Sequence, residues 1–270
     1  MPELPEVETV RRGLEREFGG RRIRSAVIDG ARTVRRHPPE LIVDGLRGRT
    51  VIAVRRRGKY LIVDMDSGDR LVVHLRMSGQ LRLTHAEEPI VKHTHAVFDF
   101  GDRQLRFVDP RTFGELFVLG DGEPCASIDR LGVEPLDVGR ADFAALLQRR
   151  RFVKALLLDQ PTIAGLGNIY TDELLFAARV RADRAADSLS RAEVGRLYEA
   201  MGTVLTEAIA LRGSSLYDAQ YVDLYGRPGE FQVRHQVYAR EGEPCPRCGR
   251  PVRRAVFQQR STHFCATCQR

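Results

Sequence analysis

The chain begins MPELPE, a run of proline and glutamate residues that includes a candidate nucleophile. If Met1 is removed, Pro2 becomes a free secondary amine, and a terminal amine has a reference pKa of about 8 against about 10.4 for lysine. Such an amine can attack an electrophilic carbon such as a sugar C1′. The resulting iminium would acidify neighbouring C–H bonds, and the adjacent Glu3 could donate or shuttle protons.

The same residues also fit the start of a helix. An apolar stripe at helical spacing follows them and stops at Gly19 and Gly20; it comprises Val7, Val10, Leu14 and Phe18. Pro5 suits a first helical turn, and the nearby glutamates complement the positive end of the helix dipole. This interpretation explains Pro5 and the acidity, but it leaves Pro2 unexplained.

Four of the five cysteines fall in the last 26 residues with the spacing C-x2-C-x16-C-x2-C: Cys245, Cys248, Cys265 and Cys268. Two knuckles that each offer two thiolates to one tetrahedral Zn²⁺ have this spacing. Two disulfides are the alternative, which the absence of an export signal disfavours. We interpret Cys125 as a lone thiol in a loop.

Charge and composition favour a polyanion partner. The 270 residues carry 43 Lys+Arg and 36 Asp+Glu, a net charge of +7, and 43% are hydrophobic. From His235 to Arg270 there are seven arginines and two acids, 7 − 2 = +5, so most of the excess lies in the tail. No apolar run of about 18 residues or secretory signal occurs, so we expect a soluble, cytoplasmic protein.

Periodicity predicts a β domain followed by a helical one. Short β-rich runs separated by turns extend from Ile23 to about Leu119, typical of an antiparallel sandwich or barrel. Helical patterns then cover DFAALLQRRRFVKALLLD, NIYTDELLFAARV and the stretch from Ser190 to Leu211, which opens with the capping box Ser190 to Glu193. We expect domains at 1–131 and 138–229, a linker at 132–137 and a zinc module at 235–270.

Seven motifs, in order along essentially the whole chain, resemble those of the formamidopyrimidine-DNA glycosylase family. They are MPELPEVET, RRGKYL, HLRMSG, KHTH, DPRTFG, GLGNIYTDELLF and QRSTHFCATC. The resemblance implies an α+β protein: a catalytic β-sandwich with a leading helix, then a helical domain with a helix-two-turn-helix element and a β-hairpin zinc finger. It also implies an enzyme that flips an oxidised purine out of duplex DNA, cleaves its glycosidic bond and nicks the backbone by β,δ-elimination.

The resemblance also implies roles for individual residues. Pro2 matches the Schiff-base nucleophile, Glu3 the proton donor, and Glu6 a second acid for which the helix-dipole role is an equal alternative. Lys59 matches a lysine that contacts the phosphate near the lesion; otherwise RRRGK would be a solvated basic hairpin. Arg260, near the finger turn, matches an arginine that binds phosphate during the second elimination step. The zinc would be structural, because four thiolates leave no open coordination position for water.

Flipping a base leaves a hole in the stack, which needs an apolar wedge and a donor to the orphaned base. Met77, Arg111 and Phe113 match the family's void-filling residues. Methionine and phenylalanine in hairpins are more often core, but RMSGQ and DPRTFG are typical of loop tips. The arginine would favour lesions opposite cytosine.

Further DNA contacts are implied for His93, Arg149, Lys154 and Asn168; without the resemblance, His93 and Arg149 would more often be structural. Gly165 and Gly167 precede the helix that begins near Asn168, and their free N–H groups would form a phosphate site there. The loop from Tyr217 to Phe231 matches the region that covers the flipped base.

Two departures from the family pattern are Arg76 and Gln259, which stand where glycine is frequent. Two alternative functions remain: an endonuclease VIII-like enzyme that acts on oxidised pyrimidines, and a non-catalytic zinc-containing DNA-binding protein. PELPE and the void-filling set favour the purine enzyme. We expect a monomer that binds duplex DNA.

Overall fold

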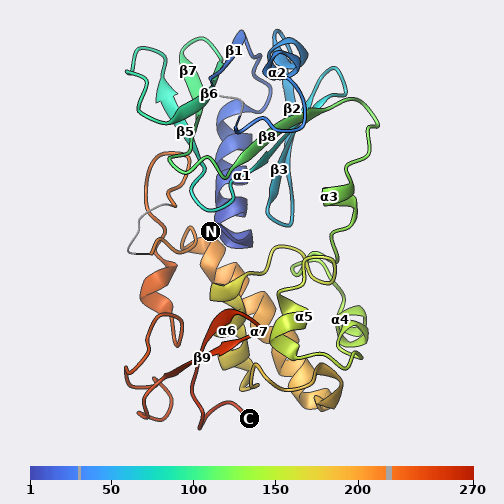
Figure 1. Ribbon diagram of the computed structural model, residues 1–270, viewed down its shortest axis with the longest axis vertical. Coiled ribbons are helices and arrows are strands. Elements are labelled where there is room, and N and C mark those ends of the chain that lie inside the picture. The colour runs from blue at the N-terminus through green and yellow to red at the C-terminus, as the bar shows by residue number, and fades with distance from the viewer. Residues whose placement is uncertain (30–31, 217–220) are drawn as a thin grey trace. The chain divides into compact units, whose positions relative to one another are not determined.

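The computed structural model describes residues 1–29, 32–216 and 221–270. The chain forms two compact units (Figure 1). Unit 1 comprises Met1–Asp129 and Leu211–Glu230, and unit 2 comprises Arg130–Ala210 and Phe231–Arg270. Among the described residues, no helix is both long and apolar enough to cross a membrane.

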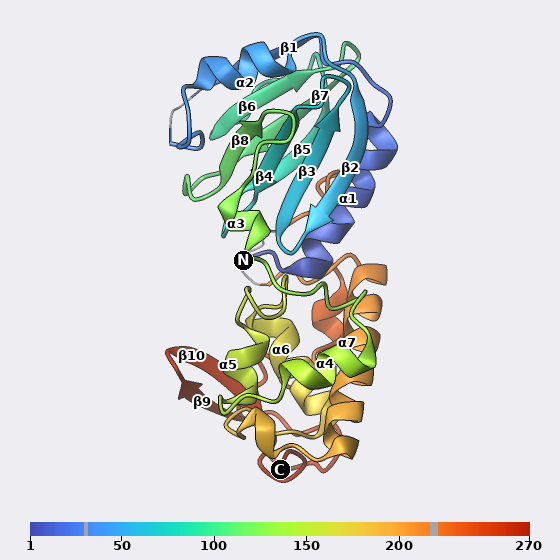
Figure 2. The ribbon, with the colours of Figure 1, turned by 90° about the vertical axis from the view of Figure 1, so that its right-hand side faces the viewer.

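Unit 1 is a β-sandwich with a leading helix, as the sequence predicts (Figure 2). Its sheets have the strand orders β1-β6-β7-β5 and β2-β3-β4-β8, and neighbouring strands pair antiparallel. The elements are α1 (Leu4–Phe18), β1 (Ser25–Ile28), α2 (Pro39–Leu46), β2 (Val51–Arg57), β3 (Tyr60–Met65), β4 (Arg70–His74), β5 (Gln80–His85), β6 (Thr94–Asp99), β7 (Arg103–Val108), β8 (Glu115–Leu119) and α3 (Ala126–Asp129).

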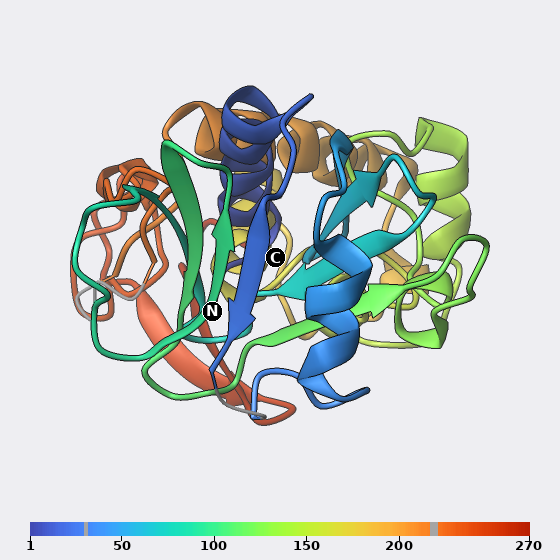
Figure 3. The same cartoon turned by 90° about the horizontal axis from the view of Figure 1, so that it is seen from above.

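One core joins the two sheets to the helices. Phe98 and Phe107 from one sheet, Leu61 and Val73 from the other, and the α1 stripe belong to a single buried apolar cluster. Each sheet therefore hides one face against the other. α1 packs on β2 and β3, while α2 packs on β1 and β8, one strand from each sheet (Figure 3).

Unit 2 combines helices with a two-stranded hairpin. Its elements are α4 (Arg140–Leu146), α5 (Val153–Leu157), α6 (Asn168–Ala178), η1 (Ala186–Ser188), α7 (Arg191–Ala210), η2 (Phe231–Arg234), β9 (Arg253–Phe257) and β10 (Arg260–Phe264). α6 is buried on nearly every side because α5, α7 and β10 all pack against it. α7 begins with the expected capping box: Ser190 N–H donates to Glu193 Oε2 at 2.8 Å, and Glu193 N–H to Ser190 Oγ at 3.3 Å.

Two features differ from the sequence-based expectation. The stretch 142–159 is two helices rather than one, because the chain leaves helical geometry between α4 and α5 and Phe152 forms a bridge with Ala185. The segment Leu211–Glu230, which the expected helical domain 138–229 includes, belongs to unit 1. The zinc module in turn shares a compact unit with the helices.

Candidate functional site

Pro2 and Glu3 lie buried at the start of α1. The backbone N–H of Glu3 donates to Glu6 Oε2 at 2.7 Å, and the Glu3 carboxylate accepts from the backbone of Glu6. This reciprocal capping box satisfies two N–H groups that a helix start would otherwise leave unpaired. The helix-start interpretation of MPELPE is therefore correct, and the same bonds fix the position of the chain end.

Glu6 also fastens a distant segment to α1. Its Oε1 accepts from the backbone N–H of Ser214 at 2.7 Å. At Gly213, which has a φ of 75°, a Cβ would lie 2.4 Å from Glu6 Oε1. Burial, followed by the Glu6 charge, raises the pKa of Tyr221, whose hydroxyl donates to the Arg212 carbonyl at 3.0 Å. Glu6 thus has a positioning role for the residues on either side of Tyr217, which itself lies outside the described residues.

Lys59 occupies the turn between β2 and β3, and it is only 7% exposed. This turn and the start of α1 lie at the same end of unit 1 (Figures 1 and 2). Arg56 Nε lies 3.2 Å from Glu8 Oε2, an ion pair that ties β2 to α1. Burial, then the charges of Arg76 and Lys59, lower the pKa of His74 to about 3. The imidazole is therefore neutral near Lys59, so it adds no further positive charge there.

The void-filling candidates are exposed, as their loop assignment predicts. Met77 is 43% exposed and Phe113 is 42% exposed. The Arg111 guanidinium carbon lies 4.8 Å from the centroid of the Phe113 ring. Large apolar side chains at such exposure are available to a partner surface, so the core alternative for both residues is wrong.

A buried carboxylate, Asp109, joins the loops that carry them. Its Oδ1 accepts from Ser78 Oγ at 2.5 Å and from the backbone N–H of Arg111 at 3.2 Å, while Oδ2 accepts from the N–H of Gly114 at 2.6 Å. Asp109 N–H donates to the carbonyl of His93 at 2.9 Å. The structure therefore brings Met77, Arg111, Phe113 and His93 together around one residue.

The exposed turns beside these candidates use left-handed backbone. Arg76, His93 and Thr112 have φ values of 53°, 67° and 53°, and Gln258 and Gln259 in the finger turn have 47° and 60°. Positive φ is strained for residues other than glycine. Both departures from the family pattern, Arg76 and Gln259, thus stand where the backbone favours glycine.

In unit 2, Asn168 is the first residue of α6, and its Nδ2 donates to the Ser261 carbonyl at 2.9 Å. Lys154 is 3% exposed. Its Nζ donates to Asp172 Oδ1 at 2.6 Å, to the Ser261 carbonyl at 2.9 Å and to Thr262 Oγ1 at 2.8 Å. An ammonium has three donors, so all three are used. These bonds hold Lys154 against the strand that follows Arg260, and the expected DNA contact of Lys154 stays a prediction.

Only the Gly165 part of the expected phosphate site before α6 needs correction, because the N–H of Gly165 donates to Gln160 Oε1 at 3.0 Å. Arg149 and Arg260 are exposed. Arg260 opens β10 and, with Arg151 and Gln258, lines a hollow of about 200 Å³ between α5 and the hairpin. These two arginines, unlike Lys154, present their charge to solvent.

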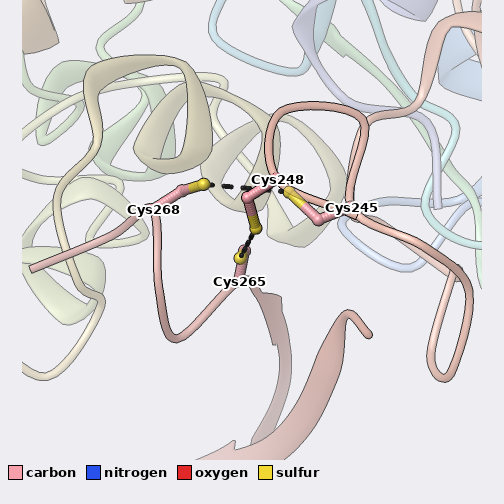
Figure 4. A group of neighbouring side chains, drawn as sticks. All are labelled: Cys245, Cys248, Cys265 and Cys268. Atoms are coloured by element: carbon pink, nitrogen blue, oxygen red, sulfur yellow. Dashed lines mark hydrogen bonds between the residues drawn. The ribbon is translucent and has the colours of Figure 1, made fainter. Parts of the chain in front are cut away.

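The four tail cysteines converge as their spacing predicts (Figure 4). Their Sγ atoms all lie within 4.8 Å of one another, with Cys245 to Cys268 at 3.9 Å and Cys248 to Cys265 at 3.5 Å. Tetrahedral Zn–S bonds of about 2.3 Å place sulfurs roughly 3.8 Å apart. The residues therefore fit one structural zinc.

α6 anchors this zinc module. Glu173 accepts from the backbone N–H groups of Gln236, Val237 and Tyr238 at 2.8 to 3.0 Å. Burial raises the pKa of Glu173, whereas these three hydrogen bonds act to lower it. Asp172 accepts from the His263 N–H at 2.8 Å. One helix thus presents Asn168 at its start and holds the finger through two adjacent acids in its second turn.

Sequence reasoning missed Asp109, Asp172 and Glu173. A signal existed for the last two, because adjacent acids in the otherwise apolar helix NIYTDELLF must find partners when buried. For Asp109 the signal was weaker: an Asp-Pro pair marks a turn, but nothing local shows that the carboxylate reaches Ser78.

Three family models match the chain. They describe the formamidopyrimidine-DNA glycosylase N-terminal domain over residues 1–116, the H2TH domain of the same proteins over 131–220, and a zinc finger found in FPG and IleRS over 242–270.

Known relatives match along their full length. A formamidopyrimidine-DNA glycosylase of Herpetosiphon aurantiacus is 46% identical, covering 100% of both chains. The MutM (Fpg) structure from Thermus thermophilus is 45% identical with a TM-score of 0.88, covering 99% of this chain and 98% of that one. Lactococcus lactis Fpg, solved with DNA containing N7-benzyl-Fapy-dG, is 36% identical with a TM-score of 0.91 and covers 99% of each.

Proposed function

Because this chain belongs to the formamidopyrimidine-DNA glycosylase family, we propose that its buried terminal Pro2 is the nucleophile with which it excises oxidised purines from duplex DNA. The enzyme is a base-excision glycosylase with AP-lyase activity. It acts on duplex DNA, and we place it in the cytoplasm with the nucleoid, as a monomer. The observation that carries the assignment of Pro2 is the capping box that fixes Pro2 and Glu3 at the start of α1.

The chemistry begins after Met1, which is 53% exposed, has been removed. The Pro2 amine attacks C1′ as the bond from C1′ to the base breaks. The base leaves with the electron pair of that bond and takes up the proton that the Pro2 nitrogen loses. Opening of the sugar follows: Glu3 protonates O4′, and the nitrogen lone pair forms the iminium. Loss of a C2′ proton then expels the 3′ phosphate, and a second elimination expels the 5′ phosphate.

The remaining candidates bind and orient the DNA. We assign Lys59 and Arg260 to the phosphates of the reacting nucleotide, with Lys59 assisting elimination and Arg260 the second step. Met77 and Phe113 fill the hole, and Arg111 donates to the orphaned cytosine. His93, Arg149, Lys154 and Asn168 hold the backbone elsewhere. Lys154 keeps Ser261 in place beside Arg260.

Borohydride reduction tests the nucleophile, because it traps the iminium as a covalent protein–DNA adduct. Protein shown by mass to lack Met1 should form the adduct with 8-oxoguanine duplex. Pro2→Gly and Glu3→Gln should lose excision while binding the duplex. Glu40→Gln, an exposed acid in the first turn of α2, is the matched control and should behave as the parent. Absence of the adduct from processed protein contradicts the mechanism.

Substrate choice needs a separate comparison. A purine enzyme should cleave 8-oxoguanine opposite cytosine faster than thymine glycol, and the reverse order would favour the endonuclease VIII-like alternative. If neither duplex is trapped by borohydride but both bind tightly, the non-catalytic alternative is favoured.

A further inference from the structure

Four arginines line a hollow of about 590 Å³ in unit 1, far from Pro2. Arg21, Arg22 and Arg24 follow the end of α1, and Arg47 follows α2. α1 has 15 residues, and a helix rises about 1.5 Å per residue, so roughly 22 Å of helix separates this hollow from Pro2. The arginine hollow is therefore distinct from the end of α1 at which Pro2 lies.

The guanidinium groups of the hollow are only partly neutralised. Arg21 pairs with Asp102, and Arg22 Nε donates to the Gly48 carbonyl at 2.8 Å. Arg24 and Arg47 are exposed, and within the described part of the chain neither side chain has a hydrogen-bond or ion-pair partner. The four arginines and Asp102 together carry 4 − 1 = +3.

Several other arginines of unit 1 have a carboxylate partner. Arg12 pairs with Glu8, Arg55 with Asp64 and Arg103 with Glu17. Grouping unpaired like charges costs repulsion, which a bound anion would relieve. Arginine is also the side chain best matched to phosphate, since its planar fork donates two parallel hydrogen bonds.

We propose that the arginine hollow binds the backbone phosphates of a second DNA segment while the enzyme holds a first segment at Pro2. The proposal rests on the proposed function for its choice of DNA as the anion. Duplex DNA is stiff over about 150 bp, so a short duplex engaged at Pro2 does not fold back to this hollow. A protein with two DNA-binding surfaces passes directly from one segment to another during its search for lesions.

The test uses the full chain saturated with a short duplex that carries an uncleavable tetrahydrofuran abasic analogue. A labelled, undamaged duplex is then titrated and followed by fluorescence anisotropy, with stoichiometry checked by sedimentation. Arg24→Ala combined with Arg47→Ala is compared with Arg130→Ala combined with Arg191→Ala. The control arginines are also exposed and also lack a partner among the described residues, so both double variants lose two charges.

The parent and the control should bind the second duplex. The hollow variant should bind it about tenfold or more weakly, and its slope of log K against log salt should shrink by about 2, one unit per lost phosphate contact. Undamaged duplex should speed release of the labelled abasic duplex from the parent but not from the hollow variant. Parent that binds one duplex only, or two double variants that bind the second duplex equally, would overturn the proposal.

Excision and borohydride trapping are measured on the same proteins. Both should be unchanged in the hollow variant, because neither Arg24 nor Arg47 belongs to the catalytic end. A parent that fails to trap but binds two duplexes would count against the catalytic assignment alone.

Discussion

At the scale of single residues, burial decides which groups can carry charge. His74 is buried beside Lys59, and its pKa is lowered to about 3 from the ordinary 6.5. Lys154 is equally buried but stays compensated by Asp172 and two further acceptors. Both are basic residues in the sequence, but burial leaves the His74 imidazole neutral, whereas Lys154 is paired with the Asp172 carboxylate.

The first prediction concerns the pH dependence of stability. The unfolded chain protonates His74 below about pH 6.5 and the folded chain does not, so stability should fall as pH falls from 6.5 towards 3. The backbone N–H of Arg76 donates to His74 Nδ1, and the variant His74→Asn keeps a side-chain acceptor for this N–H. Between pH 7 and pH 5 the parent should lose about 2 kcal/mol more stability than this variant. Urea unfolding at the two pH values measures the difference, and equal losses would contradict it.

At the scale of elements, loops are held in place by a few polar anchors and by unusual backbone. Asp109 replaces regular strand pairing where β7 gives way to the Arg111 loop, and α6 carries Asp172 and Glu173 towards the finger. These anchors act between segments far apart in sequence. They explain how exposed side chains such as Phe113 can be pre-organised without a core around them.

The second prediction tests the Asp109 anchor. In Asp109→Asn, an amide NH2 replaces one of the carboxylate oxygens towards which three donors point. The lost hydrogen bond should destabilise the folded loops by about 1 to 3 kcal/mol. Duplex excision should slow about tenfold or more, since 1.4 kcal/mol corresponds to a tenfold change. Borohydride trapping on a single-stranded abasic site, which leaves no hole in a stack, should change little. Asp44→Asn, an exposed acid on α2, serves as control; equal losses on both substrates would indicate general damage.

The third prediction concerns the finger turn. Gln259 has a φ of 60°, and relief of left-handed strain by glycine is worth about 1 kcal/mol. Gln259→Gly should therefore raise the melting temperature of unit 2. Gln148→Gly, at an exposed position without positive φ, should lower it. A calorimetric scan decides between these signs, and a lower melting temperature for Gln259→Gly would refute the strain argument.

At the scale of the whole molecule, the candidate functional residues are divided between two compact units. The chain end with Pro2, the proposed nucleophile, lies in unit 1, and the finger with Arg260 lies in unit 2. Cys245 and Cys265 belong to a buried cluster with Phe176 of α6, and Arg247 donates to the Phe176 carbonyl at 2.6 Å. Zinc therefore stabilises the fold around α6 as well as the base of the hairpin.

The fourth prediction follows from this coupling. Structural zinc contributes on the order of 10 kcal/mol to folding, so chelation should strongly lower the transition of unit 2 and leave unit 1 folded. Lesion-duplex binding should fall with it and return when zinc is restored. Cys125→Ser should retain zinc at one equivalent by metal analysis, whereas Cys265→Ser should not. Chelated protein with unchanged melting and binding would exclude a structural zinc.

Much of the molecule was determined by local pattern. Strand alternation, the stripe behind MPELPE, the Ser190 capping box and the cysteine spacing act over a few residues, so the sequence alone predicts the β-sandwich, α1, α7 and the zinc module. α2 was missed although Pro39 and Glu40 signal a helix start, because short apolar runs are ambiguous between helix and strand. The chemistry of a terminal amine suggested Pro2, and the motif resemblance supplied Lys59 and the void-filling candidates.

Only the tertiary structure decided which polar groups remain available. Whether Lys154 contacts solvent depends on Asp172 and Ser261, and whether Gly165 offers its N–H depends on Gln160. The assignment of Leu211–Glu230 to unit 1 follows from Ser214 binding Glu6, a contact across 208 residues. Hydrogen bonds saturate and burial is collective, so neither can be assigned from a local window of sequence.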